Sequence, residues 1–222
     1  MFWGIWFSMD EDISIINSNT RREKIRNFFI NNKKLLIMFF SLIILLAFSY
    51  FAYEEIKYRS NKKLAEKYNN ITINYDAKSQ LKIKKDLVEI INKKNSTYSV
   101  MALYFIIDND IKSSNEEINQ FFDILINEVR LEKEIKNLII YKKGLFNSNF
   151  ESENNLIAIL NPVINSDSVW KSHALYLIAE YFMDKNQKQK AKEFYNQILN
   201  YKKSNDNILI EARKRLNRDF SE

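Results

Sequence analysis

The stretch LLIMFFSLIILLAFSYFAY, which runs from Leu35 to Tyr53, contains no charged residue and decides the fold of this chain. Its length matches the roughly 20 apolar residues that a helix needs to cross the hydrocarbon core of a bilayer. Two lysines precede it and two glutamates follow it. Only an α-helix satisfies every backbone N–H and C=O group within one such segment. The sequence therefore predicts a single transmembrane helix from Leu35 to Tyr53.

A buried core helix and a cleavable signal peptide both fit this stretch less well than a membrane span does. A buried core helix is usually shorter, or it carries polar residues along one face, whereas this stretch contains only Ser41 and Ser49 as small polar residues. A cleavable signal peptide has a shorter apolar region and ends in a small-x-small pattern. Here Ala52 is preceded by Tyr50, which is too large for that pattern. We therefore expect an uncleaved membrane span.

The composition indicates an all-α fold. The chain has 222 residues, with 2 Gly and 1 Pro. Strands need turns, and turns draw on Gly, Pro, Asn and Asp, whereas helices need few special backbone positions. The residues after the span suffice for one domain. We expect a tetratricopeptide-like array of helical hairpins, in which Asn and Ser supply most of the helix caps and connections.

The span divides the chain into four expected parts. These are an N-terminal segment over residues 1–34, the span over 35–53, a helical linker over 54–75 and the helical domain over 76–222. The first eight residues are either a mistaken extension ahead of Met9 or an interfacial anchor through Trp3 and Trp6. Lysines and arginines near the span are nearly balanced, but they are denser in the short N-terminal tail. The positive-inside rule then favours a cytoplasmic N-terminus.

The charged residues exclude several classes of function. The net charge is +6, but basic and acidic residues alternate along the expected helices, which is typical of solvated faces and not of a nucleic-acid interface. The chain has no Cys and one His, so it offers no thiolate, no Cys nucleophile and no histidine pair for a metal. Carboxylate pairs such as Glu116–Glu117 lie among lysines. We expect no enzyme, no catalytic residue, no metal site and no cofactor.

Apolar residues recur at helical spacing throughout the region after the span. The pattern predicts that the span's helix continues to residue 69 and that further amphipathic helices cover residues 80–94, 118–129 and 131–145. Residues 100–107 are an apolar run that fits either a strand or a buried helix, and the neighbouring helices favour the helix. Gly144 is expected near a helix C-terminus, and Pro162 is expected to kink or end the following helix.

Residues 172–203 match the size pattern of one tetratricopeptide repeat. Ala179 and Ala191 are small where two helices cross, and Phe182 and Tyr195 are expected to fill the space beside the crossing. Asn186 lies in the turn, at a position that needs a left-handed backbone conformation. The Gly and Pro of the pattern are missing, and a final helix carrying Leu209, Ala212 and Leu216 follows as a cap.

The chain resembles the YfgM-type ancillary subunits of the bacterial Sec translocon, in their shorter alphaproteobacterial form. The resemblance is carried by the basic segment RREKIRNFF at residues 21–29, the single span, the helical linker and the run VWKSHALYLIA at residues 169–179. It implies an inner-membrane protein with its N-terminus in the cytoplasm and its tetratricopeptide-like domain in the periplasm. It also implies association with the Sec translocon and with periplasmic chaperones.

A stripe on the first helix of the repeat is the candidate partner-binding surface. It consists of His173, Tyr176, Glu180 and Met183. By resemblance to tetratricopeptide repeats, this stripe faces the groove in which partner segments lie, and Tyr and Met suit adaptable contacts with apolar segments. The alternative is that another helix of the same domain covers the stripe. His173, taken alone, is expected to be a surface residue.

The expected function is that of a membrane-anchored binding module that assists secreted or membrane proteins as they emerge from the translocon. The alternative is a scaffold for cell-envelope or cell-division complexes that uses the same repeat for a different partner. Localisation in the cell separates the two, since an even membrane distribution fits the first function and a band at mid-cell fits the second.

Overall fold

The computed structural model describes residues 20–76 and 79–220. Every regular element within these ranges is a helix, and they contain no strand. The all-α prediction is thus confirmed for this part of the chain. The two possibilities for the N-terminus, a start at Met9 or an anchor through Trp3 and Trp6, concern residues outside the described ranges. The structure divides into two compact units, Met1–Asn61 and Lys62–Glu222.

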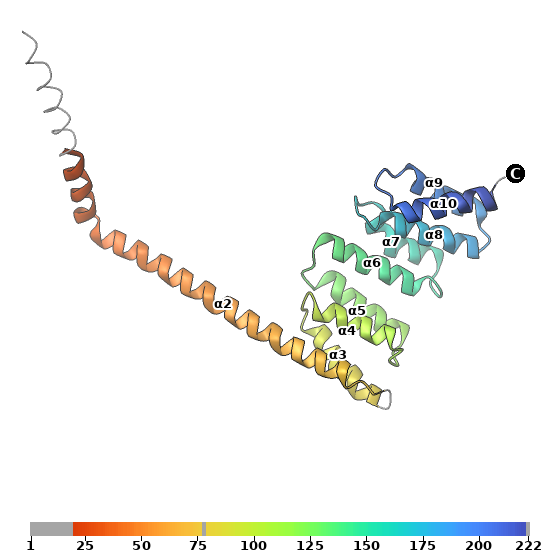
Figure 1. The fold of residues 1–222 in the computed structure, drawn as a ribbon, viewed down its shortest axis with the longest axis horizontal. Coiled ribbons are helices and arrows are strands. Elements are labelled where there is room, and N and C mark those ends of the chain that lie inside the picture. The colour runs from red at the N-terminus through yellow and green to blue at the C-terminus, as the bar shows by residue number, and fades with distance from the viewer. Residues whose placement is uncertain (1–19, 77–78, 221–222) are drawn as a thin grey trace, which may run out of the picture. The chain divides into compact units, whose positions relative to one another are not determined.

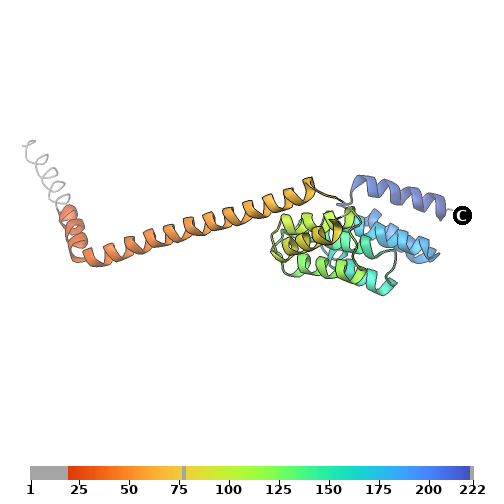
Figure 2. The ribbon, with the colours of Figure 1, turned by 90° about the horizontal axis from the view of Figure 1, so that it is seen from below.

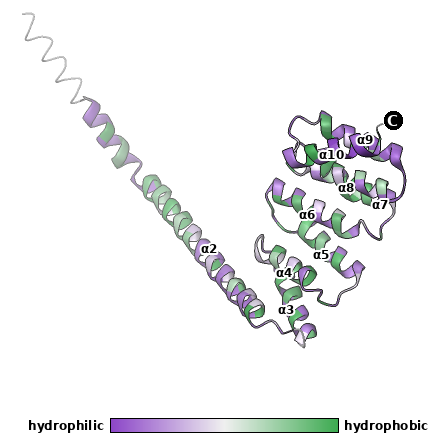
Figure 3. Cartoon of the chain, turned by 45° about the vertical axis from the view of Figure 1, so that its right-hand side comes forward, coloured by the Kyte–Doolittle hydropathy of each residue, from purple (hydrophilic) through white to green (hydrophobic). Residues whose placement is uncertain are grey.

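The first unit contains a helix over residues 20–31 and the apolar part of α2, which spans Lys33–Ile73. The predicted continuation of the span's helix past Tyr53 is confirmed. None of the most apolar window of α2 is buried against other described residues, and α2 is long and apolar enough to cross a membrane. In Figure 3 the ribbon of this part of α2 is mostly green, the colour of hydrophobic residues. Large side chains such as Met38 and Phe48 are each 71% exposed there.

The second unit begins with the last turns of α2 and continues through eight further described helices, which follow one another in chain order (Figures 1 and 2). Residues 62–75 belong to this unit, because Tyr68 is buried in its core. The helices are α3 (Gln80–Asn92), α4 (Tyr98–Asp108), α5 (Asn115–Asn127), α6 (Lys133–Asn147), α7 (Glu153–Ile164), α8 (Lys171–Asp184), α9 (Lys188–Asn200) and α10 (Asp206–Asp219).

Each helix from α3 onward packs against the next one in the chain, and α6 also contacts α8, which in turn contacts α10. The buried apolar side chains form two clusters, one built mainly by α3, α4 and α5 and the other by α7, α8 and α9. Adjacent residues of α6 belong to different clusters, Ile139 to the first and Ile140 to the second. Helix α6 therefore joins the two cores. The apolar run at residues 100–107 is a buried helix, as expected.

Ser and Asn side chains cap several helices, as the shortage of Gly predicted. The Ser114 and Ser152 hydroxyls accept hydrogen bonds from backbone N–H groups in the first turns of α5 and α7, and Asn205 does the same for α10. The turn between α8 and α9 places Asn186 at a φ of 57°, the left-handed conformation expected there. Such side chains satisfy N–H groups that a helix start leaves without intrahelical partners.

The crossing of α8 and α9 has the packing that the sequence predicted. Ala179 and Ala191 are completely buried, and so are Tyr195 and, to within 1% exposure, Phe182. The ring of Phe182 stacks on that of Phe194, with centroids 5.5 Å apart. Small side chains let two helix backbones approach closely, and the aromatic rings then fill the space beside the contact.

One predicted helix end is wrong, and a second lies close to its expected place. Helix α6 continues past Gly144 to Asn147, and Gly144 is buried inside it. The glycine is needed for packing, since a Cβ at this position would lie 2.8 Å from Leu160 Cγ and closer still to Leu160 Cδ2. Pro162 lies within α7, which ends at Ile164. It therefore precedes the end of the helix by two residues, within the last turn.

Replacing Gly144 with Ala is expected to destabilise the second unit by about 1–3 kcal/mol, because the added methyl group overpacks the contact with Leu160. Urea denaturation of the full chain in detergent, followed by circular dichroism, measures this loss. The double variant Gly144→Ala/Leu160→Ala makes room for the methyl group. It should therefore lose less free energy than the sum of the two single variants. If the free-energy losses of the two single variants add up in the double variant, the contact between residues 144 and 160 is not the cause of the destabilisation.

Candidate protein-binding surfaces

His173 lies in an aromatic cluster between α6 and α8. Its ring centroid is 5.1 Å from that of Trp170 and 5.9 Å from that of Tyr141, and Tyr141 and Trp170 stack at 18°. The Nδ1 atom is buried and has no hydrogen-bond partner among the described residues. Burial lowers the pKa of His173, and its hydrogen bond with the Val169 backbone opposes this effect. His173 is therefore only partly a surface residue, because the aromatic rings of Tyr141 and Trp170 lie against it.

Tyr176 and Glu180, further along the predicted stripe, face residues of α9 and α10. The Glu180 carboxylate pairs with Arg215 of α10 and accepts a hydrogen bond from the Tyr195 hydroxyl of α9. Tyr176 packs against Tyr195, with ring centroids 5.9 Å apart. Met183 is half-buried against the second core. The stripe is thus not one open surface. For Tyr176 and Glu180 the structure fits the alternative prediction, in which other helices of the same domain cover the stripe.

The environment of His173 leads to a pH-dependent stability. Because its pKa is lower in the folded protein than the usual value of about 6.5, the unfolded chain binds the proton more readily. The free energy of unfolding should therefore fall as the pH drops below about 6.5, with a slope of at most about 1.4 kcal/mol per pH unit from this one residue. Urea denaturation between pH 5 and pH 8 measures the slope. The variant His173→Phe keeps an aromatic ring and should reduce the slope of the unfolding free energy against pH. An unchanged slope would show that other groups cause the pH dependence.

An open groove lies between α5 and α7 on one side of α6, with a volume of about 450 Å³. We call it the amide groove. Asn119 of α5 and Asn147 of α6 exchange two side-chain hydrogen bonds across it, of 2.9 and 2.8 Å. Lys143 pairs with Asp123 at 2.7 Å. The rest of the lining includes Glu116, Gln120, Glu151, Asn155 and Ile159. Because the amides of Asn119 and Asn147 already bind each other, the polar side chains of this groove mainly hold α5 and α6 together.

A second groove, of about 420 Å³, is lined by α4, α5 and α6 and by the residues that follow α6. We call it the apolar groove. In the described part of the chain, α4 and α6 each pack on α5 but not on each other, and this leaves the groove open. Leu145 and Phe150 at its edge are 42% and 44% exposed. Its other lining residues are Tyr104, Ile107, Asp108, Phe122, Lys142, Phe146 and Asn149.

One polar group beneath the apolar groove has no partner. The Tyr104 hydroxyl is buried, and the residues that the structure describes provide no hydrogen-bond partner for it. Burial, with a smaller contribution from Asp108, raises the pKa of Tyr104 to about 12. An unpaired buried donor costs about 1–3 kcal/mol. The groove itself offers a bound segment the exposed apolar side chains of Leu145 and Phe150.

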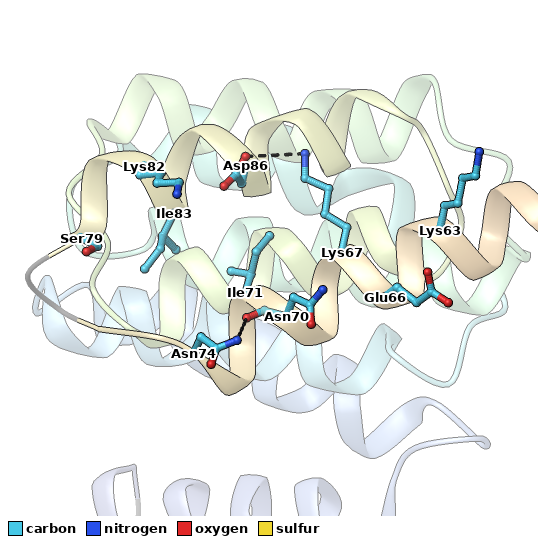
Figure 4. A pocket seen from close by; sticks show the side chains of 10 residues that line it. All are labelled: Lys63, Glu66, Lys67, Asn70, Ile71, Asn74, Ser79, Lys82, Ile83 and Asp86. Atoms are coloured by element: carbon cyan, nitrogen blue, oxygen red, sulfur yellow. Dashed lines mark hydrogen bonds and ion pairs between the residues drawn. The ribbon is translucent and has the colours of Figure 1, made fainter.

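The largest cavity, about 550 Å³, lies between the end of α2 and α3 (Figure 4). Ile71 and Ile83 form its apolar part, and Lys67 bridges to Asp86 at 3.6 Å and to Glu89 at 2.6 Å. The Asn74 side chain donates to the Asn70 carbonyl at 3.0 Å. The ion pairs of Lys67 link α2 to α3. The rim carries charges of both signs, so the cavity favours no one class of ligand.

Among residues 20–76 and 79–220, no group of three or more His, Asp or Glu side chains is placed to hold a metal ion. The apolar groove could not be found from the sequence, because its residues alternate with core residues on the same helices.

Comparison with protein-family models, with curated proteins and with solved structures yields no match. The resemblance to the YfgM-type subunits stays a prediction, which rests on the residues and architecture that carry it.

Proposed function

We propose that this protein is a membrane-anchored protein-binding module, in which α2 is the single span and the helices of the second unit bind segments of other polypeptides. The proposal is carried by the combination, in one chain, of an exposed helical stretch without charge, residues 35–53, and a helical domain with an open apolar groove. Exposed apolar surface of this extent on α2 requires a nonpolar environment. The protein performs no reaction in this proposal.

The helical domain is proposed to be a tetratricopeptide-like array. Support comes from the packing of each helix on the next and from the contacts of α6 with α8 and of α8 with α10, which are typical of stacked hairpins. The small and aromatic residues at the crossing of α8 and α9 also fit the repeat pattern. In such an array, the bound segment lies in a groove between helices, and we place it in the apolar groove.

The proposed partners are the Sec translocon and periplasmic chaperones, as the resemblance implies. The protein would lie in the inner membrane with its N-terminus in the cytoplasm and its helical domain in the periplasm. A tether beside the translocon raises the effective concentration of the binding domain to the millimolar range for a short linker, so weak contacts suffice. The exposed apolar side chains of Leu145 and Phe150 fit such weak, sequence-tolerant binding.

Capture from membranes tests the proposal. A tagged copy solubilised in mild detergent should retain translocon subunits or chaperones. The variant Leu145→Asp/Phe150→Asp should lose them, because it places charge at the edge of the apolar groove. The control Ile135→Asp/Ile210→Asp changes two apolar residues of similar exposure, 42% and 48%, outside that groove. Recovery of the tagged protein alone, or equal capture by both variants, would contradict the proposal.

A further inference from the structure

The helix over residues 20–31 is distinct from α2. A turn at Asn32 separates them. The Asn32 backbone N–H and its side-chain amide both donate to the Phe28 carbonyl, at 3.0 and 2.9 Å, and so close the first helix. The Asn32 carbonyl then accepts from the Leu36 N–H at 2.9 Å. A separate short helix therefore precedes the apolar stretch, within the same compact unit.

This short helix has an apolar face that nothing described covers. Ile25, Phe28 and Phe29 stand at i, i+3 and i+4, which places them on one side of a helix. They are 58%, 57% and 55% exposed. Glu23 and Asn27 lie on the opposite side by the same geometry. Ile30 is the one large apolar residue of the helix outside this face.

Two cations lie at the borders of the apolar face, and the others lie near the ends of the short helix. At 100° per residue, Lys24 and Arg26 lie on either side of Ile25. Arg21 and Arg22 occupy the first turn, and Lys33 and Lys34 follow the turn at Asn32. None of these six cations forms an ion pair with an acidic residue that the structure describes; all are exposed. Long cationic side chains beside an apolar face can bury their stems and keep their charges at a polar boundary.

We propose that residues 20–31 form an interfacial helix, which lies along the membrane surface. Its cations, together with Lys33 and Lys34 at the start of α2, bind the phosphate groups of anionic phospholipids. The proposal rests on the membrane anchoring proposed above. Charge complementarity and continuity with the apolar stretch identify lipid as the partner that covers the apolar face. Phe28 precedes Leu35 by seven residues, which span at most about 10 Å at 1.5 Å per helical residue, so the apolar face stays within reach of the headgroup layer.

Labelling of single cysteines tests where this helix lies, because the chain contains no Cys. A fluorophore is attached to the full-length variant Phe28→Cys or Asn27→Cys in vesicles of phosphatidylcholine and phosphatidylglycerol. The label at 28 should be quenched by lipids that carry a quencher near the headgroup, and the label at 27 by iodide in the water. Equal quenching of the two labels would overturn the proposal.

A label at Leu42→Cys distinguishes failure of this inference from failure of the membrane anchor. It should be quenched by lipids that carry the quencher deep in the acyl chains. If it is quenched there while the labels at 27 and 28 behave alike, the anchor holds and the interfacial helix is wrong. If it is open to iodide, the membrane anchoring itself is wrong.

Removing the charges tests the choice of lipid. The variant Arg21→Gln/Arg22→Gln/Lys24→Gln/Arg26→Gln should reduce the ratio of phosphatidylglycerol to phosphatidylcholine that co-purifies with the protein, by on the order of fivefold per cation lost. The control Arg130→Gln/Lys188→Gln/Lys202→Gln/Arg213→Gln removes four exposed cations from the second unit and should leave the ratio unchanged. An unchanged ratio in the first variant, or specific cross-links from residue 28 to an acidic protein, would overturn the proposal.

Discussion

The variant Ile43→Arg/Leu46→Arg is expected to be released from membranes by alkaline carbonate, whereas the unmodified protein stays in the membrane pellet. Both residues lie in the middle of the exposed apolar part of α2. Insertion scales assign an arginine at the centre of a transmembrane helix about 2.5–3.5 kcal/mol each, so two arginines cost about 5–7 kcal/mol. That cost shifts an insertion equilibrium by more than a thousandfold.

The control for this experiment adds the same charges elsewhere on α2. The variant Ser60→Arg/Asn69→Arg places two arginines at exposed positions beyond the apolar stretch and should remain in the membrane pellet. Immunoblots of pellet and supernatant measure the partition. If Ile43→Arg/Leu46→Arg stays in the pellet as well as the control does, α2 is not the anchor.

The variant Tyr195→Ala is expected to cause the largest loss of stability in the second unit, about 3–5 kcal/mol. Tyr195 is completely buried, and its ring packs against Tyr176 and Phe220. Its hydroxyl donates to Glu180, and burial together with this carboxylate raises the pKa of Tyr195. The substitution removes the ring from the core. It also removes the hydrogen bond that the Glu180 carboxylate accepts and leaves this carboxylate its ion pair with Arg215.

Two further variants separate packing from hydrogen bonding at this position. Tyr195→Phe keeps the ring and should cost about 1.5–3 kcal/mol, since it removes only the hydrogen bond to a charged acceptor. Asn196→Ala, at the exposed neighbouring position, should stay within about 0.5 kcal/mol of the unmodified protein. Urea denaturation of the full chain in detergent measures all three. A loss below about 1 kcal/mol for Tyr195→Ala would mean that α8, α9 and α10 do not share the core described here.

The helical fold was largely predictable because hydrophobic periodicity is a local signal. The residues at Ile118, Phe121, Phe122 and Leu125 are all buried on one side of α5, as their spacing predicts. The small residues Ala179 and Ala191 likewise indicated the crossing of α8 and α9. The end of α6 was wrongly predicted because Gly144 was interpreted by its local preference. At Gly144 the requirement is instead set by Leu160, sixteen positions further along the chain.

The candidate surfaces were less predictable because they depend on residues far apart in the sequence. Arg215 lies 35 residues after the glutamate that it pairs with, and no periodic pattern links the two. The enclosure of His173 depends on Tyr141 of another helix. The apolar groove exists because α4 and α6 both pack on α5 and leave space between them. Such features follow from how helices stack, which single-helix patterns do not encode.

Cross-linking in intact membranes tests the central claim, that an anchored helical domain binds other polypeptides in its apolar groove. A photoreactive group is attached to Leu145→Cys at the edge of that groove, or to Ile210→Cys on α10 as the matched position outside it. We predict that position 145 forms cross-links to translocon subunits, periplasmic chaperones or emerging chains, identified by mass spectrometry, and that position 210 forms few. Equal yields from the two positions, or no cross-linked polypeptide at 145, would contradict the account.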